Sequence, residues 1–177
     1  MGLHGGTATT VYAGMCVTEE KLQEVQAVRR VLLVEDDPAH ARLTAMQLAD
    51  AGFAHTGMAG TLAGALDILH GNTFDAILLD LGLPDAQGLE ALHQVLAAAP
   101  DAPVLVLTSA DDDEQATRAM RMGAQDFLVK GQVDAQRLRR AISYGVERKR
   151  LLRGRLSASM FENVLNLSRN SVLALSP

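Results

Sequence analysis

The chain has 177 residues, of which 48% are hydrophobic and 3% aromatic, and its formal net charge is −5 at pH 7. These proportions are typical of a globular chain, and the acidic balance with few aromatics argues against a nucleic-acid binder. No apolar stretch approaches the roughly 18 residues of a membrane span, the N-terminus lacks the pattern of a signal peptide, and the lone Cys16 is typical of a reducing cytoplasm.

Residues 1–28 precede the first strongly apolar run, and we expect them to form a flexible leader. Its first 17 residues are rich in Gly, Thr and Ala and show no period. The acidic pair after Thr18 and the apolar residues that follow at helical spacing indicate a short helix over 18–28.

From Val31 onward the chain alternates between short apolar runs and amphipathic segments. The apolar runs predict strands at 31–34, 53–58, 74–79, 104–107 and 127–129. The segments between and after them predict helices at 38–52, 61–71, 88–99, 111–123 and from 134 to beyond 150. The first helix has Asp37 as its N-cap and Gly52 at its end, and we expect its inward residues to be Ala39, Leu43, Met46 and Leu48.

This alternation predicts an α/β fold in which a parallel sheet is covered by helices on both faces. For five such units the expected architecture is a doubly wound sheet with strand order 2-1-3-4-5, counted from the strand at 31–34. Ligands of these sheets bind beyond the carboxyl ends of the strands.

Polar residues follow four of the predicted strands. They are Glu35 and Asp36, Asp80, Thr108, and Lys130. Each alone reads equally well as a cap, a turn residue or a solvated side chain, but their coincidence at successive strand ends favours one shared site. Clustered carboxylates need a cation, and oxygen ligands suit Mg²⁺. A carboxylate beside Mg²⁺, with an ammonium and a hydroxyl nearby, is the set required to form an aspartyl phosphate.

Four motifs with these spacings resemble the receiver domain of bacterial response regulators over about residues 29–150. They are VLLVEDD at 31–37, FDAILLDLGLPDAQG at 74–88, VLVLTSA at 104–110 and GAQDFLVK at 123–130. The resemblance implies a flavodoxin-like receiver fold with an extended C-terminal helix. It also implies a Mg²⁺-dependent phosphoryl transfer from a histidine kinase or a phosphotransfer protein.

By this resemblance Asp80 is the phosphoacceptor, and Lys130 contacts first its carboxylate and then the phosphoryl group. Asp36 would bind Mg²⁺ directly, Glu35 would help through water, and the Gly82 backbone carbonyl would be a further ligand. In this family Gly82 also occupies one of the two positions that tune the lifetime of the phosphoryl group, and Ala110 occupies the other. Neither residue can position water through a side chain, so we expect a long-lived phosphoryl group.

The resemblance also assigns a switch. Thr108 would move toward the phosphoryl oxygens, and Phe127 occupies the position of the switch aromatic, although a core role for this phenylalanine is equally compatible with the sequence. The surface of the fourth helix, fifth strand and last helix would change in response. The family usually carries a cis-proline after its lysine, whereas Gly131 stands here, so we expect a trans turn.

Residues 151–177 are predicted to be a linker helix, and the segment from Phe161 resembles the opening helix and first strand of a PAS domain. We therefore expect a downstream PAS, kinase or diguanylate cyclase module in a longer chain. The imperfect heptads of the last helix are compatible with a homodimer. We interpret the basic residues at 147–155 of this helix as a solvated surface, in preference to a nucleic-acid contact.

Three other functions are open to this sequence. A pseudo-receiver would be an interaction or dimerisation module that is never phosphorylated, but the intact acids, Thr108 and Lys130 favour phosphorylation. A phosphatase would need a second acid at position 82, which is Gly. A flavodoxin-like FMN binder would need a phosphate loop rich in Gly, Ser and Thr after the first strand. We expect the chain to assist its own modification without conventional enzymatic turnover.

Overall fold

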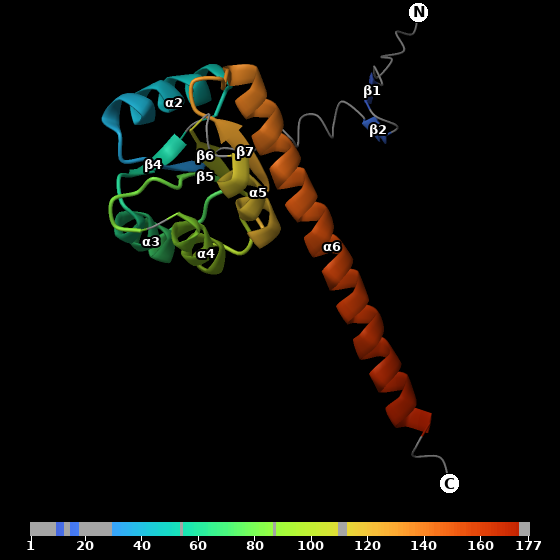
Figure 1. Cartoon of the computed structure of the whole chain (residues 1–177). Helices are drawn as coiled ribbons and strands as arrows, with labels where there is room; N and C mark the ends of the chain where they lie inside the picture. Colours follow the sequence, from blue (N-terminus) through green and yellow to red (C-terminus); the bar gives the residue numbers. More distant parts are fainter. Residues whose placement is uncertain are drawn as a thin grey trace, which may run out of the picture.

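The computed structural model describes residues 10–12, 15–17, 30–53, 55–86, 88–109 and 113–173, with five parallel strands between two layers of helices (Figure 1). The strands of this sheet are β3 (Val31–Val34), β4 (His55–Ala59), β5 (Ala76–Asp80), β6 (Val104–Thr108) and β7 (Asp126–Val129). The helices are α2 (Pro38–Asp50), α3 (Leu62–Gly71), α4 (Leu89–Ala98), α5 (Asp113–Met122) and α6 (Ala135–Leu173).

The strand order is β4-β3-β5-β6-β7, and every neighbouring pair is parallel. Counted from β3 this is the order 2-1-3-4-5, so the predicted doubly wound fold is confirmed. The three central strands β3, β5 and β6 are buried along their whole length. They are continuous apolar runs because helices cover both of their faces.

Two separate apolar clusters fill the space above and below the sheet. On one face α3 and α4 pack against the sheet through residues that include Leu62, Ala65, Leu69, Leu92 and Val95. On the other face α2 and α6 do so through residues that include Ala41, Leu48, Leu138, Ile142 and Val146. The two layers of helices cover both faces of the sheet, so packing on both sides fixes the strands that end at its carboxyl edge.

The inward face of α2 differs from the prediction. Of the four residues expected to point inward only Leu48 is buried, whereas Ala39 is exposed and Leu43 and Met46 are 45% and 59% exposed. The other buried position is Ala41, two helical turns before Leu48. The helix therefore contacts the sheet along a narrow stripe, and its apolar residues outside that stripe face solvent or the loop after β7.

The second strand of the sheet begins later than the predicted position 53. Phe53 is buried, but its backbone amide donates to the Leu48 carbonyl at 2.9 Å and so closes the end of α2. Gly52 has a φ of 86°, which confirms its predicted role at this helix end. The strand thus starts only once the helix cap is complete.

The N-terminal segment contains two short strands, β1 (Thr10–Tyr12) and β2 (Met15–Val17), which pair antiparallel. They differ from the predicted leader without regular structure. The β-branched and aromatic residues Thr10, Val11 and Tyr12 favour a strand, which a reading based on Gly, Thr and Ala content overlooks. The helix predicted over 18–28 lies outside the described residues.

Helix α6 runs for 39 residues and extends well beyond the sheet (Figure 1). It continues past Arg150, as predicted, and remains helical as far as Leu173. No helix among the described residues combines the length and hydropathy needed to cross a membrane.

Candidate functional site

Four strands bring polar side chains to one edge of the sheet. Glu35 follows β3, Asp80 ends β5, Thr108 ends β6 and Lys130 follows β7, and these strands are successive neighbours. Glu35, Asp80 and Thr108 are only 4%, 6% and 4% exposed. Because burial of unpaired polar groups costs free energy, their gathering at a single edge indicates a functional site.

Three carboxyl groups form the acidic side of this site. Glu35, Asp36 and Asp80 each offer an oxygen, and these oxygens lie within 4.8 Å of one another. Glu35 and Asp80 are buried while Asp36 is exposed. The cluster therefore has two fixed carboxylates and one that is open to solvent, an arrangement that could hold a metal ion reached from the outside.

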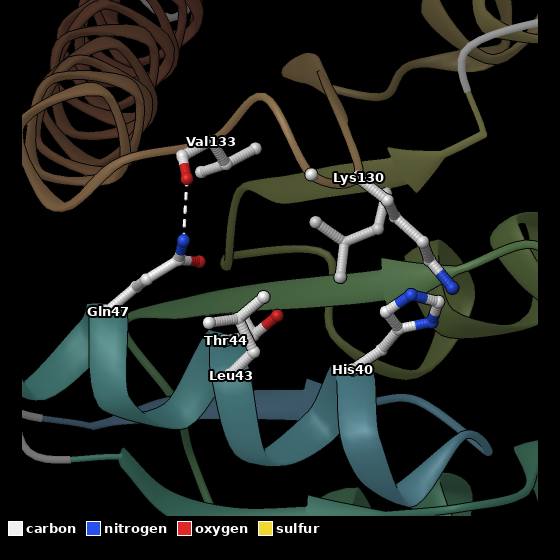
Figure 2. Close-up of a pocket in the computed structure, with 8 residues that line it drawn as sticks. His40, Leu43, Thr44, Gln47, Lys130 and Val133 are labelled. Carbon is white, nitrogen blue, oxygen red and sulfur yellow. Dashed lines mark hydrogen bonds between the residues drawn. The ribbon is translucent and has the colours of Figure 1, made fainter.

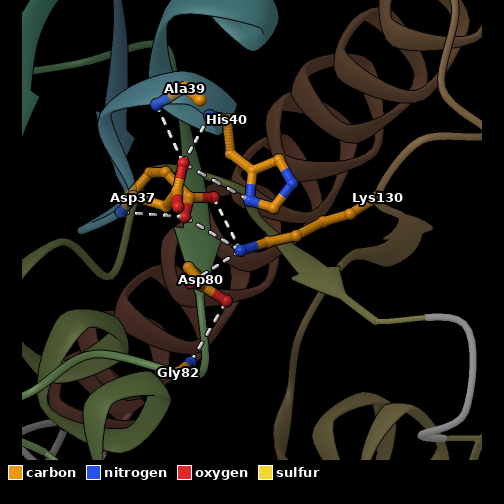
Figure 3. Close-up of polar contacts among 7 residues, drawn as sticks. Asp37, Ala39, His40, Asp80, Gly82 and Lys130 are labelled. Carbon is orange, nitrogen blue, oxygen red and sulfur yellow. Dashed lines mark hydrogen bonds and ion pairs between the residues drawn. The ribbon is translucent and has the colours of Figure 1, made fainter.

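Lys130 supplies the positive charge of the site. Its Nζ lies 2.7 Å from Asp80 Oδ2, 2.9 Å from Glu35 Oε1 and 2.8 Å from Glu35 Oε2. Figure 3 shows the lysine side chain extending over the edge of the sheet toward Asp80. One ammonium thus bridges two buried carboxylates, with a third carboxylate beside them.

The two carboxylate oxygens of Glu35 can accept more contacts than the described residues donate to them, which suits a cation. Glu35 Oε2 is buried and accepts no hydrogen bond from the described residues, although the ammonium of Lys130 is near. Glu35 Oε1 also accepts a long hydrogen bond of 3.3 Å from the Asp37 amide. Three carboxylates and one ammonium leave an excess of negative charge, and this oxygen-only donor set fits a hard divalent ion such as Mg²⁺.

The electrostatics of the site follow from burial and pairing. Burial raises the pKa of Glu35, and the neighbouring Asp80 acts in the same direction, while Lys130 opposes both. Burial disfavours the charged form of Lys130, but its hydrogen bonds to Asp80 and Glu35 outweigh that effect and hold its pKa above the usual value. Lys130 is therefore a fixed cation at neutral pH.

Comparison with known proteins identifies this arrangement. A family profile described as the response regulator receiver domain matches residues 31–143. The chain belongs to this family. Receivers are signalling domains of two-component systems, and the fold and the acidic edge described above are those of a receiver.

Three similar proteins illustrate the match. The regulatory protein LuxO of Vibrio vulnificus is 35% identical over 131 residues, which are 74% of this chain and 28% of LuxO. A response regulator receiver domain protein from Clostridium thermocellum is 26% identical with a TM-score of 0.63, covering 70% of this chain and 98% of that one. The receiver of a modulated diguanylate cyclase from Desulfovibrio desulfuricans is 30% identical with a TM-score of 0.62, with the same coverage. This chain thus spans only about a quarter of LuxO.

The receiver's loop after β5 places Gly82 beside the Asp80 carboxylate. The Gly82 amide donates to Asp80 Oδ1 at 3.1 Å, which fixes the carboxylate that also contacts Lys130 through Oδ2. A Cβ at position 82 would lie 3.4 Å from Asp80 Oδ2. Glycine therefore keeps the space directly beside the Asp80 carboxylate oxygens free of side-chain atoms.

The two predicted switch residues lie on neighbouring strands. Thr108 is buried, and its backbone carbonyl accepts a hydrogen bond of 2.8 Å from the Lys130 amide. Phe127 is partly buried and packs against the same apolar cluster as α3 and α4. This packing is compatible with the core reading of Phe127, and its role as a switch stays a prediction. Ala110 lies outside the described residues.

The loop after Lys130 has the trans turn that the sequence predicts. Gly131 adopts a φ of 79°, and no cis peptide bond occurs in the described parts of the chain. The loop is tied to α2, because Gln47 Nε2 donates to the Val133 carbonyl at 2.6 Å. Figure 2 shows this bond at one end of a small cleft, with His40 and Lys130 at the other.

Sequence reasoning missed two side chains that hold the loops of the site. Gln47 contacts the loop after β7, and Asp85 of the loop after β5 accepts hydrogen bonds from the first amides of α3. All three bonds join residues far apart in the sequence. No local pattern signals them.

Proposed function

We propose that this receiver accepts a phosphoryl group on Asp80. The donor is a phosphohistidine presented by a histidine kinase or a phosphotransfer protein. An Asp80 carboxylate oxygen attacks the phosphorus, a P–O bond forms, and the P–N bond to histidine breaks. The observation that carries the proposal is the contact of Asp80 with Lys130 and the Gly82 amide inside a cluster of three carboxylates.

Each site residue has a part in this transfer. The Gly82 amide holds Asp80 Oδ1, and Lys130 holds Asp80 Oδ2, so the nucleophile is oriented before the donor arrives. Lys130 then neutralises charge on the transferred group, and Thr108 donates a hydrogen bond to one of its oxygens. These groups act by positioning and electrostatics, which account for most of the catalysis of phosphoryl transfer.

Mg²⁺ is the cofactor that we propose for the acidic cluster. Asp36 and Asp80 would bind it directly, Glu35 would do so through water, and the Gly82 carbonyl would be a further ligand. When bound, the ion neutralises phosphoryl oxygens that would otherwise be repelled by three carboxylates. The charge excess and the buried Glu35 Oε2, whose contact is the ammonium of Lys130, support this assignment.

We further propose that phosphorylation changes the surface formed by α5, β7 and α6. Thr108 ends β6 opposite Val129 of β7, and Phe127 lies two residues before Val129 on that strand, so movement of Thr108 toward the phosphoryl group would reach this surface through β7. Beryllofluoride with Mg²⁺ should shift backbone amide resonances in α5, β7 and the first turns of α6. Failure to bind this phosphate mimic would favour the pseudo-receiver.

The decisive test is the replacement of Asp80. Asp80→Asn should abolish labelling by acetyl phosphate in the presence of Mg²⁺, because the amide cannot attack phosphorus. Asp37→Asn is the matched control, since Asp37 lies at the same edge but caps α2 through the Ala39 and His40 amides. Full labelling of Asp80→Asn, or equal loss in both variants, would contradict the assignment.

The output is a separate part of the proposal. The part of α6 after residue 150 would act as a linker helix to a PAS, kinase or diguanylate cyclase module, and it could pair with a second copy in a homodimer. Leu151 and Leu152 support such pairing because they are 53% and 47% exposed. We propose a cytoplasmic signalling protein, without conventional turnover in this domain. Sedimentation with and without beryllofluoride tests the dimer.

A further inference from the structure

The loop after β5 is hydrogen-bonded to the start of α3 by a single side chain. Asp85 Oδ1 accepts from the Leu62 amide at 2.8 Å, and Asp85 Oδ2 accepts from the Ala63 amide at 2.9 Å. Thr61 Oγ1 caps the next amide, that of Gly64, at 3.1 Å. The first three amides of α3 therefore each have a side-chain acceptor, although Thr61 is already the N-cap of the helix.

The start of α3 is in turn held against the acidic pair. The Glu35 amide donates to the Ala59 carbonyl at 2.9 Å, at the end of the strand that leads into α3. A Cβ at Gly60 would lie 3.8 Å from the Glu35 carbonyl oxygen and 3.9 Å from Asp36 Cα. The segment before α3 thus lies directly against the backbone of Glu35 and Asp36.

Asp85 belongs to the same loop as Gly82. Leu81, Leu83 and Ala86 are buried, and the Ala86 amide donates to the Leu83 carbonyl at 3.4 Å, so the loop is a compact turn. Asp85 itself is exposed. Its carboxylate is therefore held over α3 by the two hydrogen bonds, with no contribution from burial of the residue.

We infer that Asp85 is a positioning residue of the metal site. It fixes the loop that carries Gly82 to the start of α3, and the segment before α3 lies against the backbone of Glu35 and Asp36. The inference rests on the proposed function, in which Gly82 and Asp36 share one ion. Mg²⁺ requires a nearly ideal octahedral arrangement of ligands, so the separation of these two groups affects its affinity.

The test is a Mg²⁺ titration of the unphosphorylated protein by calorimetry. Asp85→Ala should weaken Mg²⁺ binding by about tenfold or more, which is the usual effect of losing a group that orients metal ligands. Asp85→Asn retains one side-chain oxygen and should give an intermediate affinity. In the absence of metal, amide hydrogen exchange at Gly82 and Ala86 should be faster in Asp85→Ala than in the wild type.

Thr61→Ala is the matched control, because it removes a cap from the same helix without touching the loop after β5. It should leave Mg²⁺ affinity and exchange at Gly82 unchanged. An equal loss of affinity in both variants would overturn the inference and leave Asp85 as a helix cap only, as would wild-type affinity in Asp85→Ala and Asp85→Asn. A wild-type protein that binds no Mg²⁺ would overturn the proposed metal site itself.

Discussion

Lys130 Nζ lies 2.7 Å from Asp80 Oδ2, so the cation is in contact with the proposed nucleophile before any phosphoryl donor arrives. The side chains of Lys130 and Asp80 are 19% and 8% exposed, which places this contact at the boundary between core and solvent. Transition-state stabilisation by a charge that is already in position needs no reorganisation during the reaction. The same contact has a stability consequence, because the lysine also neutralises Glu35.

Replacement of Lys130 by Met should destabilise the metal-free protein by about 3 kcal/mol at neutral pH, because two buried carboxylates would lose their shared cation. Mg²⁺ should restore part of this loss, since it binds the same carboxylates. Urea unfolding with and without Mg²⁺ measures both effects. Lys149→Met is the control: its ammonium donates to the Pro100 carbonyl at an exposed position, and its loss should change stability by less than about 0.5 kcal/mol.

If Lys130→Met and Lys149→Met have equal stability, the ion pair with Asp80 and Glu35 does not hold the site together. Labelling by acetyl phosphate gives a second measurement on the same proteins. It should be lost in Lys130→Met and retained in Lys149→Met.

Replacement of Gly82 by Leu should slow labelling of Asp80 by about tenfold or more, because a bulky side chain would lie over the carboxylate and displace the donor. Gly82→Ala is the matched control. Its Cβ would lie 3.4 Å from Asp80 Oδ2, an ordinary contact distance, so labelling should stay near the wild-type rate. Initial rates with acetyl phosphate and Mg²⁺ distinguish the two variants, and equal rates would show that the space beside Asp80 is not needed.

The strand ends of this fold could be predicted because they depend on local sequence. The apolar runs at 31–34, 74–79 and 104–107 correspond to the three buried strands, and the parallel topology brings Glu35, Asp80, Thr108 and Lys130 to one edge. The prediction of the inward face of α2 was wrong. This helix contains apolar residues on more than one side, and only tertiary packing selects Leu48 over Met46 for burial. Periodicity is a weak guide where the apolar stripe is not unique.

The loop contacts could not be predicted at all. Gln47 is 86 residues from Val133, and Asp85 is 22 and 23 residues from Ala63 and Leu62. A polar side chain in a surface position has many alternative partners, and the sequence does not select among them. Such side-chain contacts are determined by the tertiary fold. They nevertheless position the loops that carry the site residues identified by the sequence motifs.

Asp85 should contribute a pH-dependent term to stability. Hydrogen bonds from the Ala63 and Leu62 amides lower the pKa of Asp85 below its ordinary value of 3.8. A carboxyl whose pKa is lowered by folding stabilises the protein above its unfolded-state pKa, and this contribution is lost as the pH falls through the lowered pKa. The stability difference between wild type and Asp85→Asn should therefore be constant above about pH 5 and shrink below 3.8.

Urea unfolding from pH 7 to pH 3 measures this difference directly. Thr61→Ala provides the comparison, because the Thr61 hydroxyl does not titrate in this range. Its stability difference from the wild type should be independent of pH. A difference for Asp85→Asn that stays constant down to pH 3 would show that the two amides do not favour the ionised carboxylate.

Two glycines of α6 should respond in opposite directions to the same substitution. Gly145 faces the sheet, where a Cβ would lie 2.9 Å from Gln125 Cγ and 3.1 Å from Pro103 Cβ, and the rigid proline ring cannot yield. Gly145→Ala should therefore cost about 1–3 kcal/mol through overpacking. Outside its chain neighbours and the backbone of its own helix, Gly154 has no atom within 4 Å of its Cβ position, so Gly154→Ala should stabilise the helix by about 0.5–1 kcal/mol. Thermal unfolding of both variants tests whether α6 packs closely against the receiver at Gly145. Close packing at this point would allow a change at the surface of α5, β7 and α6 to reach the linker. Equal shifts of the two midpoints in the same direction would mean that this close approach is absent in solution.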